Sequence, residues 1–289
     1  MCGATGEVRL DGTSPDVRAV TAMAEVMVPR GPDAAGVWAQ GRGALGHRRL
    51  KIIDLTEAGA QPMVDAELGL SIAWNGCIYN YESLRDELVG HGYRFFSHSD
   101  TEVLIKAYHH WGDRFVDHLK GMFAFAITER DSGRVLLGRD RLGIKPLYLS
   151  ETDDRVRFAS SLPALLAGGD VDTRIDPVAL HHYMTFHSVV PSPRTILRGV
   201  TKLPPASLLA IEAYQVAGDP SAFPEQIDDE GLRPFAPSRL FTTGARGTAT
   251  ATGPNCATAF TPTNPADDIY GVWSGRTSTR YDTSWAQVE

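Results

Sequence analysis

The sequence of 289 residues has few cysteines, no long apolar run and no excess of basic residues. Its three cysteines, Cys2, Cys77 and Cys256, are an odd count without metal-binding spacing, which favours a reducing compartment over a disulfide framework. No apolar run is long enough to cross a membrane, and the first residues lack the basic region and apolar stretch of a signal peptide, so none is expected. The net charge of −7 argues against nucleic-acid binding. We therefore expect a cytoplasmic protein that binds neither nucleic acid nor membrane.

Short strands and a few helices alternate in mixed order along the chain. Strands are expected at residues 2–10, 36–39, 44–50, 52–55, 70–74, 122–127, 135–140, 146–149, 156–160 and, as the last one, 208–211. Helices are expected at residues 17–27, 81–88, 101–111, 115–119 and 176–186, with Asn80 as the N-cap of the second and Pro177 at the first position of the last. This order predicts two packed sheets with helices outside them.

Cys2 directly follows the initiator methionine and is the first candidate catalytic residue. Removal of Met1 before a small residue leaves Cys2 as the N-terminal residue, with a thiol and an α-amine on one residue. The ordinary pKa of an α-amine is about 7.7–8.0 and that of a thiol about 8.5, so the amine can serve as the base that activates the thiol. A small residue at a frayed terminus is the simpler interpretation, and the rest of the chain must decide.

Three further positions carry groups that an amide hydrolase with this nucleophile needs. Asn75 and Gly76 offer a side-chain amide and an unencumbered backbone N–H for a developing oxyanion. Arg49 and Asp100 have the charges that complement the carboxylate and amine of an amino acid. Each also has a structural interpretation: Arg49 as a surface strand residue, Asn75-Gly76 as a hairpin turn and Asp100 as a helix cap. No metal site is predicted.

Ordered blocks over residues 2 to about 212 resemble the glutaminase domain of class II glutamine amidotransferases, most closely its asparagine synthetase branch. The blocks are Met1-Cys2-Gly3, Arg30-Gly31-Pro32-Asp33, His47-Arg48-Arg49-Leu50 with Ile53-Asp54, Gly59-Ala60-Gln61-Pro62, Asn75-Gly76-Cys77-Ile78-Tyr79-Asn80, Ser99-Asp100-Thr101-Glu102, Gly121-Met122-Phe123-Ala124-Phe125, the run from Gly138 to Tyr148, and Lys202-Leu203-Pro204-Pro205. Three of these blocks, at residues 75–80, 121–125 and 138–148, also resemble amidotransferases that amidate N-acetylglutaminylglutamine-type dipeptides.

The resemblance implies an α+β fold, the four-layer αββα sandwich of N-terminal-nucleophile hydrolases. It also implies that Cys2 attacks the side-chain amide of glutamine, with its own α-amine as base. Asn75 and the Gly76 N–H would then form the oxyanion hole, while Arg49 binds the glutamine carboxylate and Asp100 its amine. Glutamate and ammonia are the expected products, and the ammonia passes to a second active site.

Two positions depart from the family pattern. The family usually has Glu after the Asn-Gly pair, where it helps to hold the glutamine amine, and this chain has Cys77. One acidic contact to the amine is therefore missing, or substrate selection differs. The family often has His before the Arg-Gly-Pro-Asp block, and this chain has Pro29, a change expected to be structural.

The sequence changes character near residue 213. We expect residues 2–212 to form the glutaminase domain, and residues 213–289 to be a low-complexity tail, disordered or frameshifted, in place of an ATP-dependent synthetase domain. The tail lacks the Ser-Gly-Gly loop that holds pyrophosphate in that domain and shows no strand–helix alternation. We therefore expect no cofactor at the glutaminase site, and ATP and Mg²⁺ only in the missing domain.

Two interpretations from different classes remain. The first is a stand-alone glutaminase domain from an enzyme that passes ammonia to an ATP-activated carboxylate, as in asparagine synthesis. The second is a non-catalytic remnant, or a binding partner for a separate synthetase domain or subunit. The complete set of candidate residues favours the first, and the apolar area that a missing domain would cover favours the second.

Overall fold

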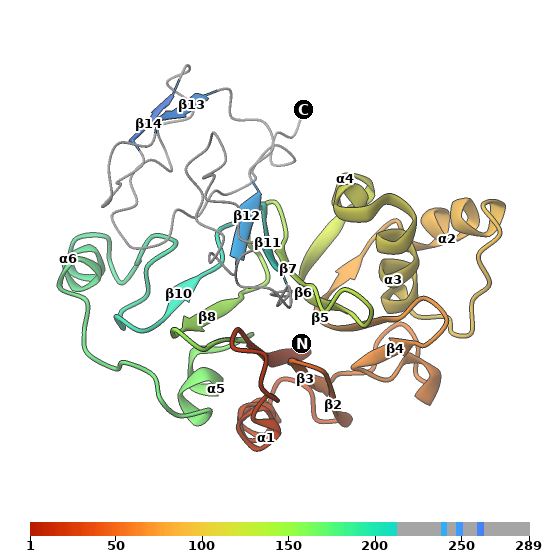
Figure 1. Cartoon of the computed structure of the whole chain (residues 1–289), viewed down its shortest axis with the longest axis horizontal. Coiled ribbons are helices and arrows are strands. Elements are labelled where there is room, and N and C mark those ends of the chain that lie inside the picture. Colours follow the sequence, from red (N-terminus) through yellow and green to blue (C-terminus); the bar gives the residue numbers. More distant parts are fainter. Residues whose placement is uncertain (213–237, 242–246, 251–258, 263–289) are drawn as a thin grey trace, which may run out of the picture.

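Two six-stranded antiparallel sheets pack face to face at the centre of the molecule (Figure 1). The structure is a computed structural model that describes residues 1–212, 238–241, 247–250 and 259–262. The first sheet has the order β10-β8-β9-β1-β3-β2, from strands β1 (Gly3–Arg9), β2 (Ala34–Gln40), β3 (Gly43–Arg49), β8 (Tyr148–Glu151), β9 (Arg155–Ala159) and β10 (Thr201–Lys202). The second has the order β12-β11-β7-β6-β5-β4, from strands β4 (Met63–Asp65), β5 (Leu70–Ile78), β6 (Gly121–Glu129), β7 (Val135–Arg139), β11 (Ser207–Ile211) and β12 (Ser238–Phe241).

Helices cover the outer face of each sheet. Helices α1 (Val17–Val26) and α5 (Leu162–Ala167) pack on the first sheet, where Val20 and Met23 belong to one buried cluster with Ala44 and Ala159. Helices α2 (Tyr81–Gly90), α3 (Asp100–Trp111) and α4 (Phe115–His118) pack on the second sheet. The remaining elements are helix α6 (Pro177–Thr185), the short 3-10 helices η1 (Glu57–Gly59) and η2 (Gly112–Arg114), and the hairpin β13 (Gly247–Thr250) with β14 (Ala259–Pro262). The predicted four-layer α+β sandwich is confirmed.

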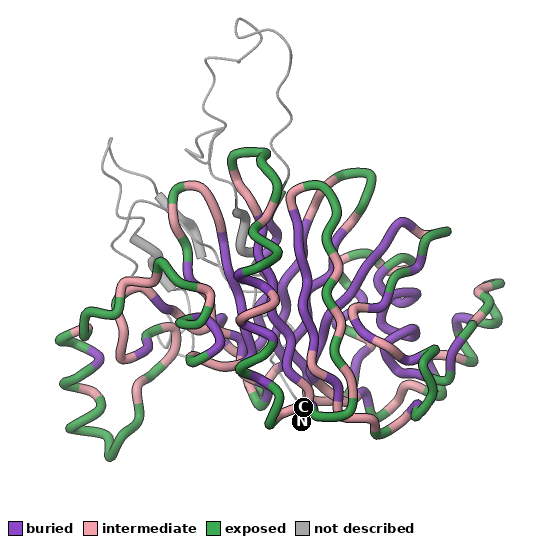
Figure 2. Tube along the Cα trace, turned by 90° about the horizontal axis from the view of Figure 1, so that it is seen from below, coloured by how far each residue is buried: buried purple, intermediate pink, exposed green. Residues whose placement is uncertain are grey.

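Alternation of large and small side chains in β5 and β6 explains the layers. Trp74, Phe123 and Phe125 face the helices, and the alternating residues Ala73 and Ala124 face the other sheet. Successive side chains of a strand point to opposite faces, so small residues let the sheets approach while large ones fill the space under the helices. Burying one such Phe contributes about 1.5–3 kcal/mol relative to exposing it. Figure 2 shows the result, with buried residues along the strands and exposed ones at the loops.

Most of the predicted elements are present, and two of the helices begin with side-chain caps that were not predicted. Asp16 accepts hydrogen bonds from Arg18 N and Ala19 N at the start of α1. Asp176 accepts from Val178 N and Ala179 N, with Pro177 at the first position of α6. Such caps satisfy N–H groups that have no partner inside the helix.

The prediction of a turn at Asn75-Gly76 is wrong. Both residues continue β5, where Asn75 lies opposite Ala124 and Gly76 opposite Phe123 of β6. A Cβ at position 76 would overlap the Trp74 ring and the Met122 carbonyl, so glycine is there for close packing rather than for a turn.

The predicted strand at residues 52–55 is also wrong, because this segment wraps around an arginine. Arg49 donates Nη1–H to the Thr56 carbonyl at 2.8 Å and an Nη2–H to the Asp54 carbonyl. Those carbonyls are then turned inward and cannot form a strand ladder, while Ile52 remains 68% exposed.

Two predicted caps differ in detail. Ser99, not Asp100, is the N-cap of α3 and accepts from Thr101 N, and Asp100 is the first helical residue. Asn80 stands at the N-cap position of α2 without a capping bond, because its amide binds the His118 carbonyl and Lys120 N instead.

Some elements were not predicted. Helix α5 is one, and strands β12, β13 and β14 show that residues 208–211 are not the last strand. Strand β12 extends the second sheet by pairing with β11. The predicted disordered or frameshifted tail falls mainly on residues 213–237, 242–246, 251–258 and 263–289, which lie outside the described residues. In the part of the chain that is described, no helix is both long and apolar enough to cross a membrane.

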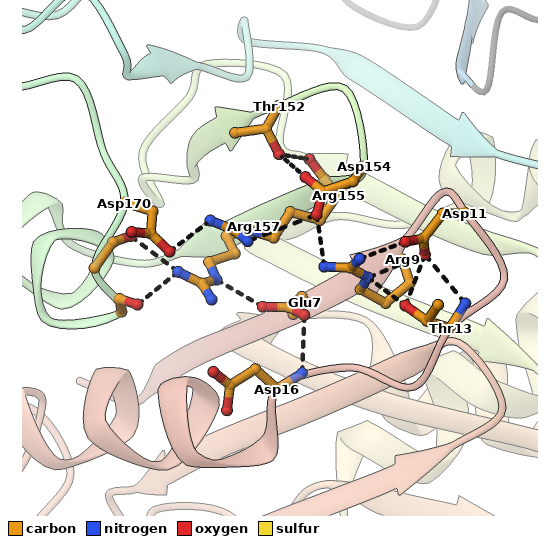
Figure 3. Close-up of polar contacts among 12 residues, drawn as sticks. Glu7, Arg9, Asp11, Thr13, Asp16, Thr152, Asp154, Arg155, Arg157 and Asp170 are labelled. Carbon is orange, nitrogen blue, oxygen red and sulfur yellow. Dashed lines mark hydrogen bonds and ion pairs between the residues drawn. The ribbon is translucent and has the colours of Figure 1, made fainter.

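The far end of β1 is tied to its surroundings by ion pairs (Figure 3). Glu7 is fully buried, accepts from Arg157 Nε at 2.6 Å and from Asp16 N at 2.9 Å. Arg157 also donates to the Gly168 and Gly169 carbonyls at the end of α5. This network joins β1, β9, α1 and α5.

Candidate functional site

A pocket open to solvent lies where the start of β1 meets the ends of β3 and β5 and the start of α3. Its walls come from segments far apart in the sequence. The lining residues are Cys2, Arg49, Leu50, Ile52, Ile53, Asp54, Gly59, Gln61, Trp74, Gly76, Cys77, Ser99, Asp100 and Thr101. Four of the five predicted site residues line this pocket.

The Cys2 thiol is partly buried at the entrance to β1. Its Sγ accepts from Leu50 N at 3.4 Å and lies 3.6 Å from the Leu50 carbonyl. A Cβ at the next residue, Gly3, would come within 2.8 Å of Met27 Sδ, so only glycine lets β1 pass this close to α1. Met1 is 59% exposed and precedes the site without being packed into the core.

Arg49 is held in the pocket wall by the loop that follows it. Its two bonds to the Thr56 and Asp54 carbonyls fix the guanidinium, and Gly59 leaves room for Nη2. An arginine has further N–H donors, and these remain for a ligand carboxylate. Burial raises the pKa of the neighbouring Asp54, but hydrogen bonds from Thr56 and from His98 N outweigh it and lower that pKa below its ordinary value.

Asn75 does not line the pocket; it lies behind the pocket wall and holds Cys2. In the amide orientation that satisfies both groups, Asn75 Nδ2 donates to the Cys2 carbonyl at 3.2 Å and Oδ1 accepts from Arg30 Nη2 at 3.1 Å. Arg30 Nε also donates to the Cys2 carbonyl at 3.1 Å. The amide has a second N–H. Gly76 itself lines the pocket, as Cys2 does.

Asp100 is a buried carboxylate at the first turn of α3. Its Oδ2 accepts from Ile78 N at 3.3 Å. Burial raises the pKa of Asp100 to about 6, although hydrogen bonds from Ile78 and at the helix start act in the opposite direction. The adjacent Cys77 thiol also has a raised pKa, first because of burial and then because of the Asp100 charge.

A hydrogen-bonded layer in the wall of the pocket was missed as part of the site. Gln61 Oε1 accepts from Trp74 N at 2.9 Å, and Trp74 Nε1 donates to Thr101 Oγ1 at 2.8 Å. His47 Nε2 lies 2.9 Å from the Trp74 carbonyl, and burial lowers the pKa of His47 to about 3, so the ring is neutral. These bonds fix the end of β5 and the start of α3. Gln61 and Thr101 lie in two of the sequence blocks that carry the family resemblance, and this was the signal that could have identified them as part of the site.

Among the described residues, no cluster of three or more His, Cys, Asp or Glu side chains is arranged to hold a metal ion. The groups that meet in the pocket are instead a thiol, an arginine, a carboxylate and backbone N–H groups. This set suits the binding and acyl chemistry of an amino acid.

Comparison with known proteins identifies the group of proteins to which this sequence is similar. A family model described as a glutamine amidotransferase domain matches residues 1–221. Asparagine synthetase [glutamine-hydrolyzing] 1 of Bacillus subtilis is 39% identical over 214 residues, which are 73% of this chain and 33% of that protein. Asparagine synthetase B of Escherichia coli is 38% identical over 169 residues, which are 57% of this chain and 30% of that protein. The chain thus spans about a third of the length of these curated relatives.

A solved structure of similar fold is the glutamine phosphoribosylpyrophosphate amidotransferase of B. subtilis, complexed with ADP and GMP. It aligns with a TM-score of 0.54 and 21% identity over 73% of this chain and 47% of that one. At this identity the likeness concerns the fold, and it agrees with the four layers described above. Together with the family match over most of the chain, it leads to one conclusion: the chain belongs to the glutamine amidotransferase domain family.

Proposed function

We propose that this chain hydrolyses glutamine to glutamate and ammonia, with Cys2 as an N-terminal nucleophile. The observation that carries the proposal is the meeting of Cys2, Arg49, Gly76 and Asp100 in one pocket, although they come from four separate segments. The names of the relatives support it, because those proteins are glutamine-hydrolysing synthetases.

The proposed reaction begins once Met1 has been removed. The α-amine of Cys2 takes the thiol proton as Sγ bonds to the side-chain carbonyl carbon of glutamine. The tetrahedral intermediate then collapses, the C–N bond breaks, and the ammonium group of Cys2 gives its proton to the leaving amide nitrogen as ammonia. Water adds to the thioester, the S–C bond breaks, and glutamate and the free thiol are released.

The remaining site residues divide between binding and charge stabilisation. Arg49 binds the glutamine carboxylate and Asp100 its ammonium group, both before and during the chemistry. The Gly76 N–H and the Asn75 amide stabilise the oxyanion. Cys77 lines the pocket near Asp100 and adds no negative charge there, so Asp100 carries the charged contact to the substrate amine.

The destination of the ammonia follows from the length of the relatives. Because the chain matches about a third of each asparagine synthetase, we propose that a separate synthetase domain or subunit uses the ammonia on an ATP-activated carboxylate. Asparagine synthesis is the preferred whole reaction, and amidation of an N-acetylglutaminylglutamine-type dipeptide is the alternative. We propose that ATP and Mg²⁺ serve that domain and that the glutaminase site needs no cofactor.

The test is glutamate release from L-glutamine by the full chain, with removal of Met1 verified by intact mass. We expect turnover by the unchanged chain, none by Cys2→Ala, and most of it retained by Cys77→Ala, the matched control thiol in the same pocket. Activity that survives in Cys2→Ala would refute the assignment. A folded wild-type chain without any glutamate release would support a non-catalytic binding role instead.

A second experiment tests the assignment of ATP. Titration of the full chain with Mg²⁺-ATP by calorimetry should give no saturable heat, and aspartate, ATP and glutamine together should yield no asparagine. Saturable binding at micromolar concentration would contradict this part of the proposal.

A further inference from the structure

Lys145 lies in the loop between β7 and β8, and its backbone is firmly held. The Asp140 carboxylate accepts from Lys145 N at 2.9 Å and also from Ile144 N at 2.9 Å. Arg139 Nε donates to the Lys145 carbonyl at 2.8 Å. Side chains on such a backbone have a defined direction, so the position of the lysine is set by the fold.

The side chain of Lys145 is a buried cation with an unusual partner. The residue is only 5% exposed, and it forms no ion pair within the described part of the chain. Its Nζ instead lies 3.4 Å from Met1 Sδ. A thioether is a weak acceptor, and a buried ammonium without an anionic partner is costly. The other buried lysine, Lys106, is paired with both Asp65 and Glu102.

The location of this contact gives the lysine a function. The proposed reaction requires that Met1 be removed. Its removal converts the backbone nitrogen of Cys2 into an α-amine, next to the space that Met1 occupied. Lys145 is also close enough to the pocket to act on Cys77: burial and Asp100 raise the pKa of that thiol, and the Lys145 charge opposes them. Lys145 therefore lies beside the first residue of the chain, and its charge reaches the Cys77 thiol of the pocket.

We propose that Lys145 assists the reaction through its charge. Its ammonium group keeps the released α-amine of Cys2 in the uncharged form, which accepts the thiol proton. This inference rests on the proposed function. A like charge within about 4–6 Å disfavours protonation of an amine, whose ordinary pKa is about 7.7–8.0. A base that is uncharged at neutral pH is what the first step requires.

The other charged groups around the N-terminus do not cancel this effect. The titratable or charged side chains that contact Cys2 or share its pocket are Arg30 after α1, Arg49 of β3, Asp54 in the following loop, Cys77 of β5 and Asp100 of α3, and Tyr148 of β8 interacts with Arg30. Arg30 binds the Cys2 carbonyl and adds a second positive charge. The Asp54 and Asp100 carboxylates, which accept hydrogen bonds from neutral donors, oppose the effect, but the cations Lys145, Arg30 and Arg49 outnumber them.

The pH dependence of kcat/KM for glutamine tests the proposal. In Lys145→Met the acidic limb should move to higher pH by about one unit, while Lys145→Arg, which keeps the charge, should follow the wild-type curve. Lys120→Met, at an exposed lysine, changes the net charge equally and should leave the limb in place. Asp100 titrates in the same range in every variant, so only the differences between curves are compared.

A titration without turnover separates this inference from the proposed function. In protein labelled with ¹³C-cysteine, the Cys2 resonances, assigned by their absence in Cys2→Ala, report protonation of the α-amine directly. We expect a higher midpoint in Lys145→Met and in Lys145→Gln, the second neutral variant, than in the wild type or in Lys145→Arg. Coinciding midpoints would overturn the role of Lys145 even if glutamine is hydrolysed, and a shifted midpoint supports it even in a chain that releases no glutamate.

Discussion

The charged side chains at the two ends of strand β1 have opposite kinds of partners. At the far end, Glu7 is paired with Arg157, and each forms a further bond to a helix end (Figure 3). At the Cys2 end, Arg30 and Arg49 bind only backbone carbonyls and an amide oxygen, and Lys145 contacts a thioether. No carboxylate forms an ion pair with any of these three cations in the described residues.

The difference separates stability from function within one strand. A buried ion pair whose remaining atoms are also bonded fixes the sheet against its helices, and breaking it is costly. Cations without an ion-pair partner can instead act on a ligand, on an N-terminal amine or on a developing oxyanion. The predictions below change one end at a time.

The largest expected loss of stability lies at the far end. Arg157→Leu leaves Glu7 buried without its cation, and we expect the free energy of unfolding to fall by about 3–5 kcal/mol. Glutamate release by the protein that remains folded should be unchanged. Urea denaturation and glutaminase assays measure the two effects, and the double variant Glu7→Leu with Arg157→Leu should recover part of the loss. A selective fall in kcat would break the comparison between the two ends.

At the Cys2 end, Asn75→Ala should lower kcat by about 10²–10³-fold with a small change in KM, because it removes the second amide N–H, which we propose as an oxyanion donor. Asn80→Ala is the matched control, since its amide bonds link α2 to the segment before β6, away from the pocket. Steady-state kinetics measure both variants. An effect of Asn75→Ala confined to KM would assign it to ground-state binding, the effect that we expect of Arg49→Ala.

Asp100→Asn should weaken catalysis while stabilising the fold. The pKa of Asp100 is raised to about 6, so the folded protein binds a proton more tightly than the unfolded chain. Its contribution favours folding below the unfolded pKa and is lost as pH rises through about 6. At pH 7 the variant should gain up to about 3 kcal/mol of unfolding free energy, and the gain should vanish near pH 4. Thermal denaturation at the two pH values checks this.

The same carboxylate should set the pH dependence of substrate binding. KM for glutamine should rise as pH falls below about 6 in the wild-type chain, because Asp100 becomes neutral. In Asp100→Asn, KM should be high at all pH values. A KM that is independent of pH near 6 in the wild type would remove Asp100 from the binding of the amine.

Much of the sandwich was predictable because its strands carry strong local patterns. The strand that carries Phe123, Ala124 and Phe125 and the helix that begins beside Pro177 are readable from the sequence. Four of the five site residues named by resemblance line one pocket, and their roles remain predictions.

The errors have a common physical origin in contacts between distant segments. Asn75-Gly76 has the composition of a turn, yet pairing with β6 and the Trp74 ring keep it in a strand. Residues 52–55 have the composition of a strand, yet Arg49 draws their carbonyls inward. Lys145 shows nothing unusual in the sequence, because its lack of an anionic partner emerges only when the loop before β8 is placed beside the N-terminus.

The most direct test of the account uses the two thiols of the pocket, Cys2 and Cys77. A glutamine analogue with a diazoketone in place of the amide alkylates the attacking thiolate irreversibly, and peptide mass spectrometry locates the label. The account predicts labelling of Cys2 in the chain without Met1, slowed by L-glutamine and slower in Lys145→Met than in Lys145→Arg at pH 7. Labelling of Cys77 instead, or labelling of Cys2 at a rate that glutamine does not change, would contradict it.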